Sequence, residues 1–210
     1  MIRNIIFDLG GVILNIDFKK SIEAFRKLGI ANIDEIFSGY IQSKFFDSYD
    51  KGLIQDKDFI TELKRYIPAA VPDEEVLDAW NAMILDFPED RIMLLKKLKP
   101  VYRIFLLSNT NSIHYPIYNK QLQEKYKIKN LSELFEKAYF SFRIGMRKPE
   151  GEFFMKVINE NGLLPEETLF VDDAPMNIEA AKNLGLKVML YKSDLMLEQA
   201  LSEFISGGSI

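Results

Sequence analysis

The chain has 210 residues, 48% of them hydrophobic and 28% charged, as expected of a globular protein with a substantial core. Its net charge of −4 argues against binding to nucleic acid or an anionic membrane surface, since both need a basic face. The absence of cysteine excludes disulfides, thiolate metal sites and cysteine catalysis, and fits a reducing compartment. With no recognisable signal peptide and no apolar run of ~18–20 residues, a soluble, cytoplasmic protein is expected.

Five short segments are apolar nearly throughout, which is the pattern of parallel strands buried on both faces. In chain order they are residues 2–8, 102–108, 137–142, 168–172 and 187–191. From residue 89 onward, helical segments alternate with these strands. This alternation predicts an α/β fold with a doubly wound parallel sheet.

About ninety residues separate the first two predicted strands, far more than a crossover connection needs. Within this gap, apolar residues recur at helical spacings of three and four in segments 21–28, 33–46, 56–66 and 73–85. We therefore predict a helical cap inserted over residues 16–87 and an α/β core formed by residues 1–15 and 88–210. The last five residues, 206–210, are expected to form a flexible tail.

Polar residues follow four of the predicted strands, at the sheet edge where ligands of open α/β sheets bind. Each group has an ordinary structural explanation: a turn, a surface lysine before a proline, or a helix cap. Because four such groups meet at one edge, a single site explains them better than four coincidences do. In chain order the groups are Asp8-Leu9-Gly10-Gly11, Ser108-Asn109-Thr110-Asn111, Lys148-Pro149 and Asp172-Asp173.

These residue types suit phosphoryl transfer. A carboxylate nucleophile can attack phosphorus and form an aspartyl-phosphate, which splits one difficult step into two easier ones. The two anions repel each other unless a divalent cation such as Mg²⁺ neutralises their field, and Mg²⁺ prefers carboxylate, water and phosphate oxygens. A hydroxyl, an ammonium group and backbone N–H groups of a glycine turn can bind the remaining phosphoryl oxygens.

The same groups resemble the four motifs of the haloacid dehalogenase superfamily, in their order and over the whole chain. That superfamily carries a helical cap after its first strand. More closely, the runs Phe7–Gly10, Ser108–Asn111, Gly145–Glu150 and Asn177–Glu179 resemble the α-D-glucose-1-phosphate phosphatase subgroup. Residues 49–54, with Phe59 behind them, resemble the cap loop of that subgroup, and Tyr49, Asp50 and Gly52 are therefore expected near the substrate.

The resemblance implies a magnesium site with four contributors. Asp8 would be both the nucleophile and a metal ligand, and the backbone carbonyl of Gly10 would be a second ligand. Asp173 would bind Mg²⁺ directly, while Asp172 would bind it either directly or through water.

The resemblance also implies how the phosphate is held. Ser108 and Lys148 would bind the transferring phosphoryl group, with Lys148 also keeping Asp8 ionised. Asn109 is expected to share in the phosphate contact. Asn177 would support the loop that carries the acid pair without touching the metal.

One position departs from the superfamily pattern. Most of its phosphatases carry an aspartate two residues after the nucleophile, which protonates the leaving group and activates water, but this chain has Gly10. The subgroup that the chain resembles shares the glycine, so inactivity does not follow. The proton carrier stays open between His114, Asp17, water and the substrate itself.

Two rival assignments are disfavoured. A phosphorelay receiver domain has its acid pair after strand one and its nucleophile in mid-chain, the reverse of the order here. A true dehalogenase needs no metal, so the acid pair argues against it.

The resulting prediction is a Mg²⁺-dependent phosphomonoester hydrolase acting on a small sugar phosphate such as a hexose 1-phosphate. The alternative is a binding or regulatory protein that lost turnover with its general acid. The expected partner is a small-molecule phosphate ester, and no nucleic-acid or membrane partner is expected. The protein is expected to be a monomer or a small homo-oligomer.

Overall fold

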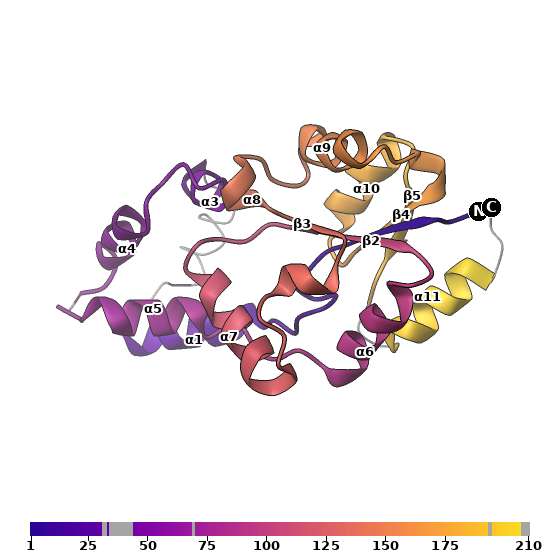
Figure 1. Cartoon of the computed structure of the whole chain (residues 1–210). Coiled ribbons are helices and arrows are strands. Elements are labelled where there is room, and N and C mark those ends of the chain that lie inside the picture. Colours follow the sequence, from indigo (N-terminus) through magenta and orange to yellow (C-terminus); the bar gives the residue numbers. More distant parts are fainter. Residues whose placement is uncertain (31–32, 34–43, 69, 193–194, 207–210) are drawn as a thin grey trace.

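The computed structural model describes residues 1–30, 33, 44–68, 70–192 and 195–206. Its centre is a parallel five-stranded sheet with the strand order β3-β2-β1-β4-β5 (Figure 1). The winding reverses at β1, since β2 and β3 extend the sheet on one side and β4 and β5 on the other. The strands are β1 (Asn4–Phe7), β2 (Arg103–Ser108), β3 (Lys137–Phe140), β4 (Thr168–Asp172) and β5 (Lys187–Leu190).

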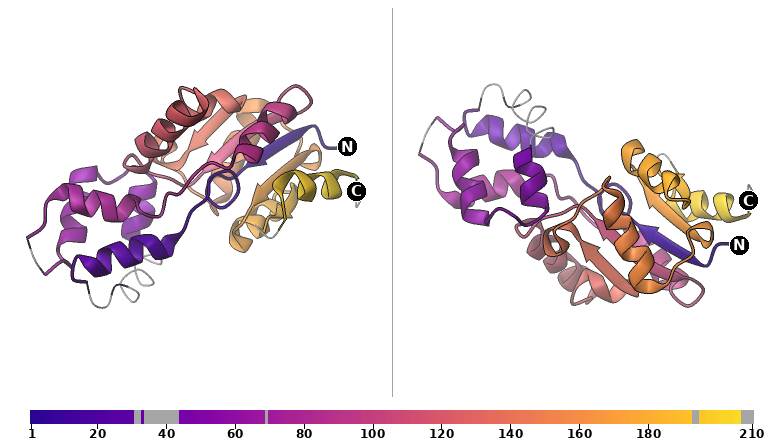
Figure 2. Two further views of the ribbon diagram at one scale, coloured as in Figure 1. Left: turned by 90° about the horizontal axis from the view of Figure 1, so that it is seen from below. Right: turned by 90° about the horizontal axis from the view of Figure 1, so that it is seen from above.

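Helices cover both faces of the sheet (Figures 1 and 2). On one face lie α6 (Glu89–Leu98), α7 (His114–Tyr126) and α11 (Leu197–Ser206); on the other lie α9 (Gly151–Asn161) and α10 (Pro175–Asn183). The strands are apolar throughout because alternate side chains pack against helices on opposite faces of the sheet. Ile5 and Phe7 pack in the cluster beneath α6, α7 and α11, whereas Ile6 packs beneath α9 and α10. The short elements are η1 (Leu131–Leu134), α8 (Ser141–Ile144) and η2 (Pro165–Glu167).

Between β1 and β2 the chain forms α1 (Phe18–Lys27), α3 (Lys44–Asp50), α4 (Asp56–Lys64) and α5 (Asp73–Asn81), which we call the helical insertion. It has its own hydrophobic cluster, in which Phe25, Phe59 and Trp80 are buried. Asp17 caps α1 by accepting a hydrogen bond from the Lys19 N–H, which explains where that helix begins. The insertion lies at the carboxyl end of the sheet, opposite the N-terminus (Figure 2).

The predicted doubly wound parallel sheet is confirmed, with strands that are at most three residues shorter than predicted. The predicted helix over residues 33–46 falls mostly outside the described residues, and α3 runs on to Asp50. Of the predicted tail, Ser206 is the last residue of α11, and residues 207–210 lie outside the described part. Across the described ranges, no helix has the length and apolar character needed to cross a bilayer.

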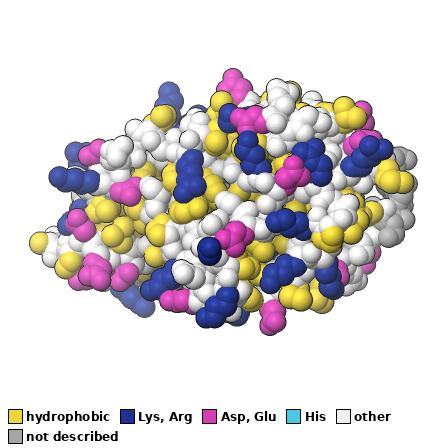
Figure 3. All heavy atoms as spheres, in the orientation of Figure 1, with side chains coloured by type: hydrophobic (Ala, Val, Ile, Leu, Met, Phe, Trp, Pro, Cys, Tyr) yellow, Lys and Arg dark blue, Asp and Glu magenta, His cyan; other side chains and the backbone are white. Residues whose placement is uncertain are grey.

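Acidic and basic side chains are interspersed over the face of the molecule drawn in Figure 3. No extended basic patch stands out among the side chains drawn there.

Candidate active site

Asp8 is positioned by the sheet itself. It follows β1 directly, and its N–H donates to the Val171 carbonyl at 2.9 Å, which extends the pairing of β1 with β4 by one residue. The chain then turns at Gly11, whose φ of +76° lies in the left-handed region. A Cβ at this position would collide with the Asp173 carboxylate. Glycine is thus needed here so that the loop after β1 can pass against the loop after β4.

Lys148 forms the centre of a buried charge cluster. Its Nζ lies 2.6 Å from Asp8 Oδ1 and 2.7 Å from Asp172 Oδ2, and the residue is 1% exposed. Burial by itself lowers the pKa of this ammonium, but the two carboxylates outweigh it and leave the pKa raised. Burial raises the pKa of Asp8 to about 7. The charge of Lys148 lowers this pKa, and the charge of Asp172 raises it. Addition of a cation beside Asp8 would favour its ionised, nucleophilic form.

The two acidic residues at the end of β4, Asp172 and Asp173, have different surroundings. Asp172 is buried, and its carboxylate accepts hydrogen bonds from the Ala174 N–H at 2.8 Å and from Asn177 Nδ2 at 3.1 Å. Asp173 is exposed at the mouth of the site. Carboxylate oxygens of Asp8, Asp172 and Asp173 lie within 4.8 Å of one another, the one such grouping of three potential ligands found among the described residues. This all-oxygen donor set fits Mg²⁺, with Asp173 the least engaged by other donors.

The predicted phosphate-binding residues come from two loops. Ser108 is buried at the end of β2. Asn109 makes two hydrogen bonds to the Lys148 backbone: Nδ2 donates to the carbonyl and Oδ1 accepts from the N–H, both at 2.9 Å. Asn109 therefore positions Lys148, and its expected contact with phosphate stays a prediction. Ser141, which the sequence did not single out, fixes the same loop by bonding both the N–H and the carbonyl of Thr110 at 2.9 and 2.8 Å.

A cavity of about 280 Å³ opens between these loops and the helical insertion. Gly10, Ser108 and Asn109 line it from the core. Its wall is mostly apolar and aromatic, with a few polar groups, which is the usual composition of a small-ligand pocket. The insertion supplies Ile16, Phe18, Phe46, Asp47, Asp50, Trp80, Met83 and Ile84, and the core adds Leu9, Leu14, Thr110, Asn111, His114, Tyr118 and Arg147.

Polar contacts join the insertion to the loop that carries Lys148. Arg147 pairs with Asp47 and, at 3.5 Å, with Asp50, both from α3. Lys51 pairs with Glu150 at 2.5 Å. Burial raises the pKa of Asp50 to about 7, with Arg147 lowering it and Asp47 raising it. The insertion thus holds a half-buried carboxyl group over the cavity.

The insertion also contacts the core through its backbone. Gly52, with φ +68°, lies so close to the Phe142 carbonyl of α8 that a Cβ would collide with it. Further along, Ser112 of the core donates to the Asp56 carboxylate of α4. The insertion is therefore docked at several separate points.

The candidates for the missing proton carrier have distinct places. His114 lines the cavity but is buried, stacks on Trp80 and shares a 2.9 Å hydrogen bond between its Nδ1 and Asn81 Oδ1. Burial lowers its pKa to about 3, so it is neutral at physiological pH. Asp17 is the α1 cap and does not line the cavity. Tyr49, which was expected near the substrate, is instead buried against Phe59, with its hydroxyl donating to Asp56 at 3.0 Å.

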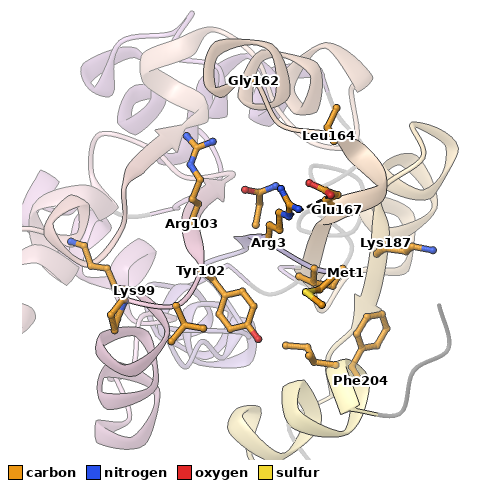
Figure 4. A pocket seen from close by; sticks show the side chains of 15 residues that line it. Met1, Arg3, Lys99, Tyr102, Arg103, Gly162, Leu164, Glu167, Lys187 and Phe204 are labelled. Carbon is orange, nitrogen blue, oxygen red and sulfur yellow. Dashed lines mark ion pairs between the residues drawn. The ribbon is translucent and has the colours of Figure 1, made fainter.

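A larger cavity, of about 1100 Å³, lies at the amino ends of the strands (Figure 4). Both arginines of its wall are engaged in ion pairs: Arg3 with Glu167 at 3.4 Å and Arg103 with Glu136 at 2.6 Å. The acidic grouping described above is absent from its wall. The grouping of potential metal ligands found among the described residues therefore lies at the other, carboxyl end of the sheet.

Comparison with known proteins agrees with this geometry. Residues 2–185 match the model of the haloacid dehalogenase-like hydrolases. The D-ribitol-5-phosphate phosphatase of Bacteroides thetaiotaomicron is 33% identical over 189 residues, which are 89% of this chain and 90% of that protein.

Solved structures give the same picture. A HAD family enzyme of Bacteroides thetaiotaomicron, crystallised with magnesium and inorganic phosphate, superposes with a TM-score of 0.82 at 35% identity over 93% of this chain and 97% of the other. A predicted HAD-like family hydrolase of Porphyromonas gingivalis gives a TM-score of 0.86 at 32% identity, covering 98% of both chains.

The superfamily expected from the four motifs is confirmed, and so is the doubly wound fold. The finer resemblance to the α-D-glucose-1-phosphate phosphatase subgroup stays a prediction. The match covers the nucleophile turn, the helical insertion, the Lys148 loop and the acid pair. This chain belongs to the haloacid dehalogenase-like hydrolases.

Proposed function

We propose that this protein is a Mg²⁺-dependent phosphomonoester hydrolase that works through an aspartyl-phosphate on Asp8. The observation that carries the proposal is the buried ammonium of Lys148 between Asp8 and Asp172, with Asp173 alongside. A metal-free hydrolase has no need of an acid pair beside its nucleophile. The named phosphatase relative and the magnesium and phosphate complex of the B. thetaiotaomicron enzyme support the same reaction and the same ion.

In this reaction an Asp8 carboxylate oxygen attacks phosphorus, and the bond from phosphorus to the ester oxygen breaks. Lys148 and Ser108 bind phosphoryl oxygens, and the ammonium stabilises the charge that builds up in the transition state. Water then attacks the aspartyl-phosphate, which releases inorganic phosphate and restores Asp8. Asp8, the Gly10 carbonyl, Asp173 and, directly or through water, Asp172 would hold Mg²⁺. The ion neutralises the repulsion between Asp8 and the phosphate.

Residues 16–87 act in this proposal as a cap, and residues 1–15 and 88–210 as the catalytic core. The insertion forms one wall of the cavity above Gly10 and Ser108, so it excludes water from the reacting groups when it is docked. A cavity of about 280 Å³ suits a small leaving group.

The leaving group we propose is a small polyhydroxylated alcohol, so that the substrate is a sugar or polyol phosphate. Asp47, Asp50 and Arg147 offer acceptors and donors for its hydroxyl groups, while Phe46 and Trp80 offer apolar surface for its C–H groups. The motif resemblance favours a hexose 1-phosphate, and the named relative acts on D-ribitol 5-phosphate. These two esters are the first to test.

The test measures phosphate release from glucose 1-phosphate, ribitol 5-phosphate, 4-nitrophenyl phosphate and an isoprenyl phosphate. Each is tested with Mg²⁺ and with excess EDTA. We expect turnover that EDTA stops and added Mg²⁺ restores, with kcat/KM higher for the polyol esters than for the isoprenyl ester. Full activity in excess EDTA would contradict the metal site. Turnover of none of the esters would contradict the phosphatase and favour the non-catalytic binding protein.

A further inference from the structure

Gly10 leaves a step of the proposed reaction without a side chain to perform it. The ester oxygen must gain a proton as it leaves, and the attacking water must lose one. A glycine can do neither, so we searched the cavity wall for another residue placed to reach the ester oxygen. The inference below rests on the proposed function and names that residue.

Asp50 is in a suitable place. It belongs to α3 of the insertion, yet it lines the same cavity as Gly10, Ser108 and Asn109. The cavity borders Gly10 and Ser108, close in the chain or in space to Asp8 and Lys148, so we expect the leaving group of a phosphate held at Ser108 and Lys148 to enter it. A carboxyl group on the insertion side of this cavity is then placed to meet the ester oxygen.

The surroundings of Asp50 suit a group that exchanges protons. The charged groups that face it are Arg147, whose Nη2 lies 3.5 Å away, and Asp47, one turn earlier on the same helix. Arg147 keeps the carboxyl group oriented, and the distance is long enough for a substrate oxygen to compete for it. Burial and Asp47 together raise its pKa to about 7, so both protonation states are populated near neutral pH.

We propose that Asp50 is the general acid and base of this enzyme, supplied by the insertion in place of the side chain that Gly10 lacks. As Asp8 attacks phosphorus, the protonated Asp50 gives its proton to the departing ester oxygen, so the product leaves as a neutral alcohol. The Asp50 carboxylate then takes a proton from the water that attacks the aspartyl-phosphate. This attack breaks the bond between phosphorus and the Asp8 oxygen and restores both carboxyl groups to their starting states.

Four other titratable groups, three of them on the insertion, are less suited to this role. His114 is neutral, its Nδ1 is engaged by Asn81, and its ring is stacked on Trp80. Asp17 and Tyr49 do not line the cavity. Asp47 lines it but is more exposed and is paired more closely with Arg147. Among the described carboxyl groups of the insertion, Asp50 therefore combines access to the cavity with burial.

The test uses substituted phenyl phosphates whose phenols differ in acidity but hardly in size, and which carry no hydroxyl groups for Asp50 to bind. The quantity measured is kcat/KM, because it covers the steps up to departure of the leaving group and not the later attack of water. We expect Asp50→Asn to lose about 10²-fold on unsubstituted phenyl phosphate and no more than about tenfold on 4-nitrophenyl phosphate, whose leaving group needs no proton. The dependence of kcat/KM on phenol acidity is then steeper in the variant than in the wild type.

Asp47→Asn is the matched control, since it makes the same chemical change on the same helix beside the same arginine. We expect it to keep the shallow wild-type dependence on phenol acidity, whatever its overall rate. An equal loss on every ester in Asp50→Asn, or an equally steep dependence in Asp47→Asn, would overturn the role of Asp50 while leaving the phosphatase intact. Failure of the wild type to hydrolyse the phenyl phosphates and also glucose 1-phosphate and ribitol 5-phosphate would overturn the proposed function itself.

Discussion

Charged residues meet in two regions of this molecule, and the two are built differently. At the floor of the site, Lys148 and Asp172 have side chains that are 1% and 0% exposed, and the charged and hydrogen-bonding partners described above all belong to the core. At the boundary between core and insertion, the side chains of Arg147 and Asp47 are 22% and 41% exposed. A buried ion cluster is costly to break, because removing one partner leaves an uncompensated charge, whereas a solvent-exposed pair contributes roughly 0–1 kcal/mol.

This difference in burial suits two different roles in catalysis. The floor is a fixed arrangement that holds the nucleophile and the phosphate in one geometry, as efficient charge stabilisation requires. The boundary consists of weaker contacts, so the insertion can undock for substrate to enter and product to leave. This comparison leads us to expect floor substitutions to abolish chemistry and boundary substitutions to change how well the site closes.

The largest effect is expected at the floor, from Asp8→Asn. The variant keeps the size of the side chain but removes the nucleophilic carboxylate, so turnover should fall below about one per cent of the wild-type rate. Its fold should persist, as judged by circular dichroism, because the surrounding hydrogen-bonding groups remain. Phosphate binding, measured in parallel by calorimetry, should survive, since a negative charge facing the anion has been removed. A variant that keeps more than about one per cent of the rate would rule out covalent catalysis by Asp8.

A smaller effect is expected at the boundary, from Gly52→Ala. The new Cβ would collide with the Phe142 carbonyl, so the loop after α3 has to shift and the insertion can no longer dock in the same way. We expect kcat/KM to fall about tenfold, equivalent to about 1.4 kcal/mol, while the binding of Mg²⁺ is retained.

The Gly145→Ala variant distinguishes the effect of impaired docking on kcat/KM from the effect of backbone strain. Gly145 has a φ of +78°, close to the +68° of Gly52, but a Cβ there would meet nothing within 4 Å. Both variants carry the strain of a left-handed alanine, and Gly52→Ala alone carries the collision. Equal losses of kcat/KM in the two variants would show that docking at Gly52 does not matter for catalysis.

The floor could be predicted from the sequence because each of its residues directly follows a strand or a short motif. Asp8, Ser108 and Asp172 lie at strand ends, and parallel strands bring their carboxyl ends to one edge. The motif identified Lys148, but it did not predict that its ammonium group contacts both Asp8 and Asp172. That contact depends on Asn109 holding the Lys148 backbone, an interaction between residues 39 positions apart that leaves no local pattern.

The boundary was much less predictable. Helical periodicity located the insertion, but it does not tell which of two neighbouring side chains faces the core. Tyr49 was expected at the substrate and lies instead within the insertion, stacked on Phe59, while Asp50, the next residue, lines the cavity. Consecutive residues of a helix point in directions about 100° apart, so the docking angle of α3 decides between them. That angle is set by packing against α8, which sequence patterns do not encode.

The smallest effect concerns His114, a buried titratable group of the core that contacts Trp80 and Asn81 of the insertion. Its pKa is lowered to about 3 in the folded protein, whereas about 6.5 is expected in the unfolded chain. Below pH 6.5 the unfolded chain therefore binds a proton that the folded protein does not, so this residue makes stability fall as the pH falls. Between pH 8 and pH 6 the expected loss is about 1 kcal/mol in the free energy of unfolding.

His114→Gln keeps a polar side chain but cannot take up this proton. Comparing the variant with the wild type by urea unfolding at both pH values cancels the contribution of the other titrating groups. We expect the wild type to lose about 1 kcal/mol more than the variant. An equal loss in both proteins would mean that His114 is accessible to protons in the folded state, and that the boundary is open far more often than its contacts indicate.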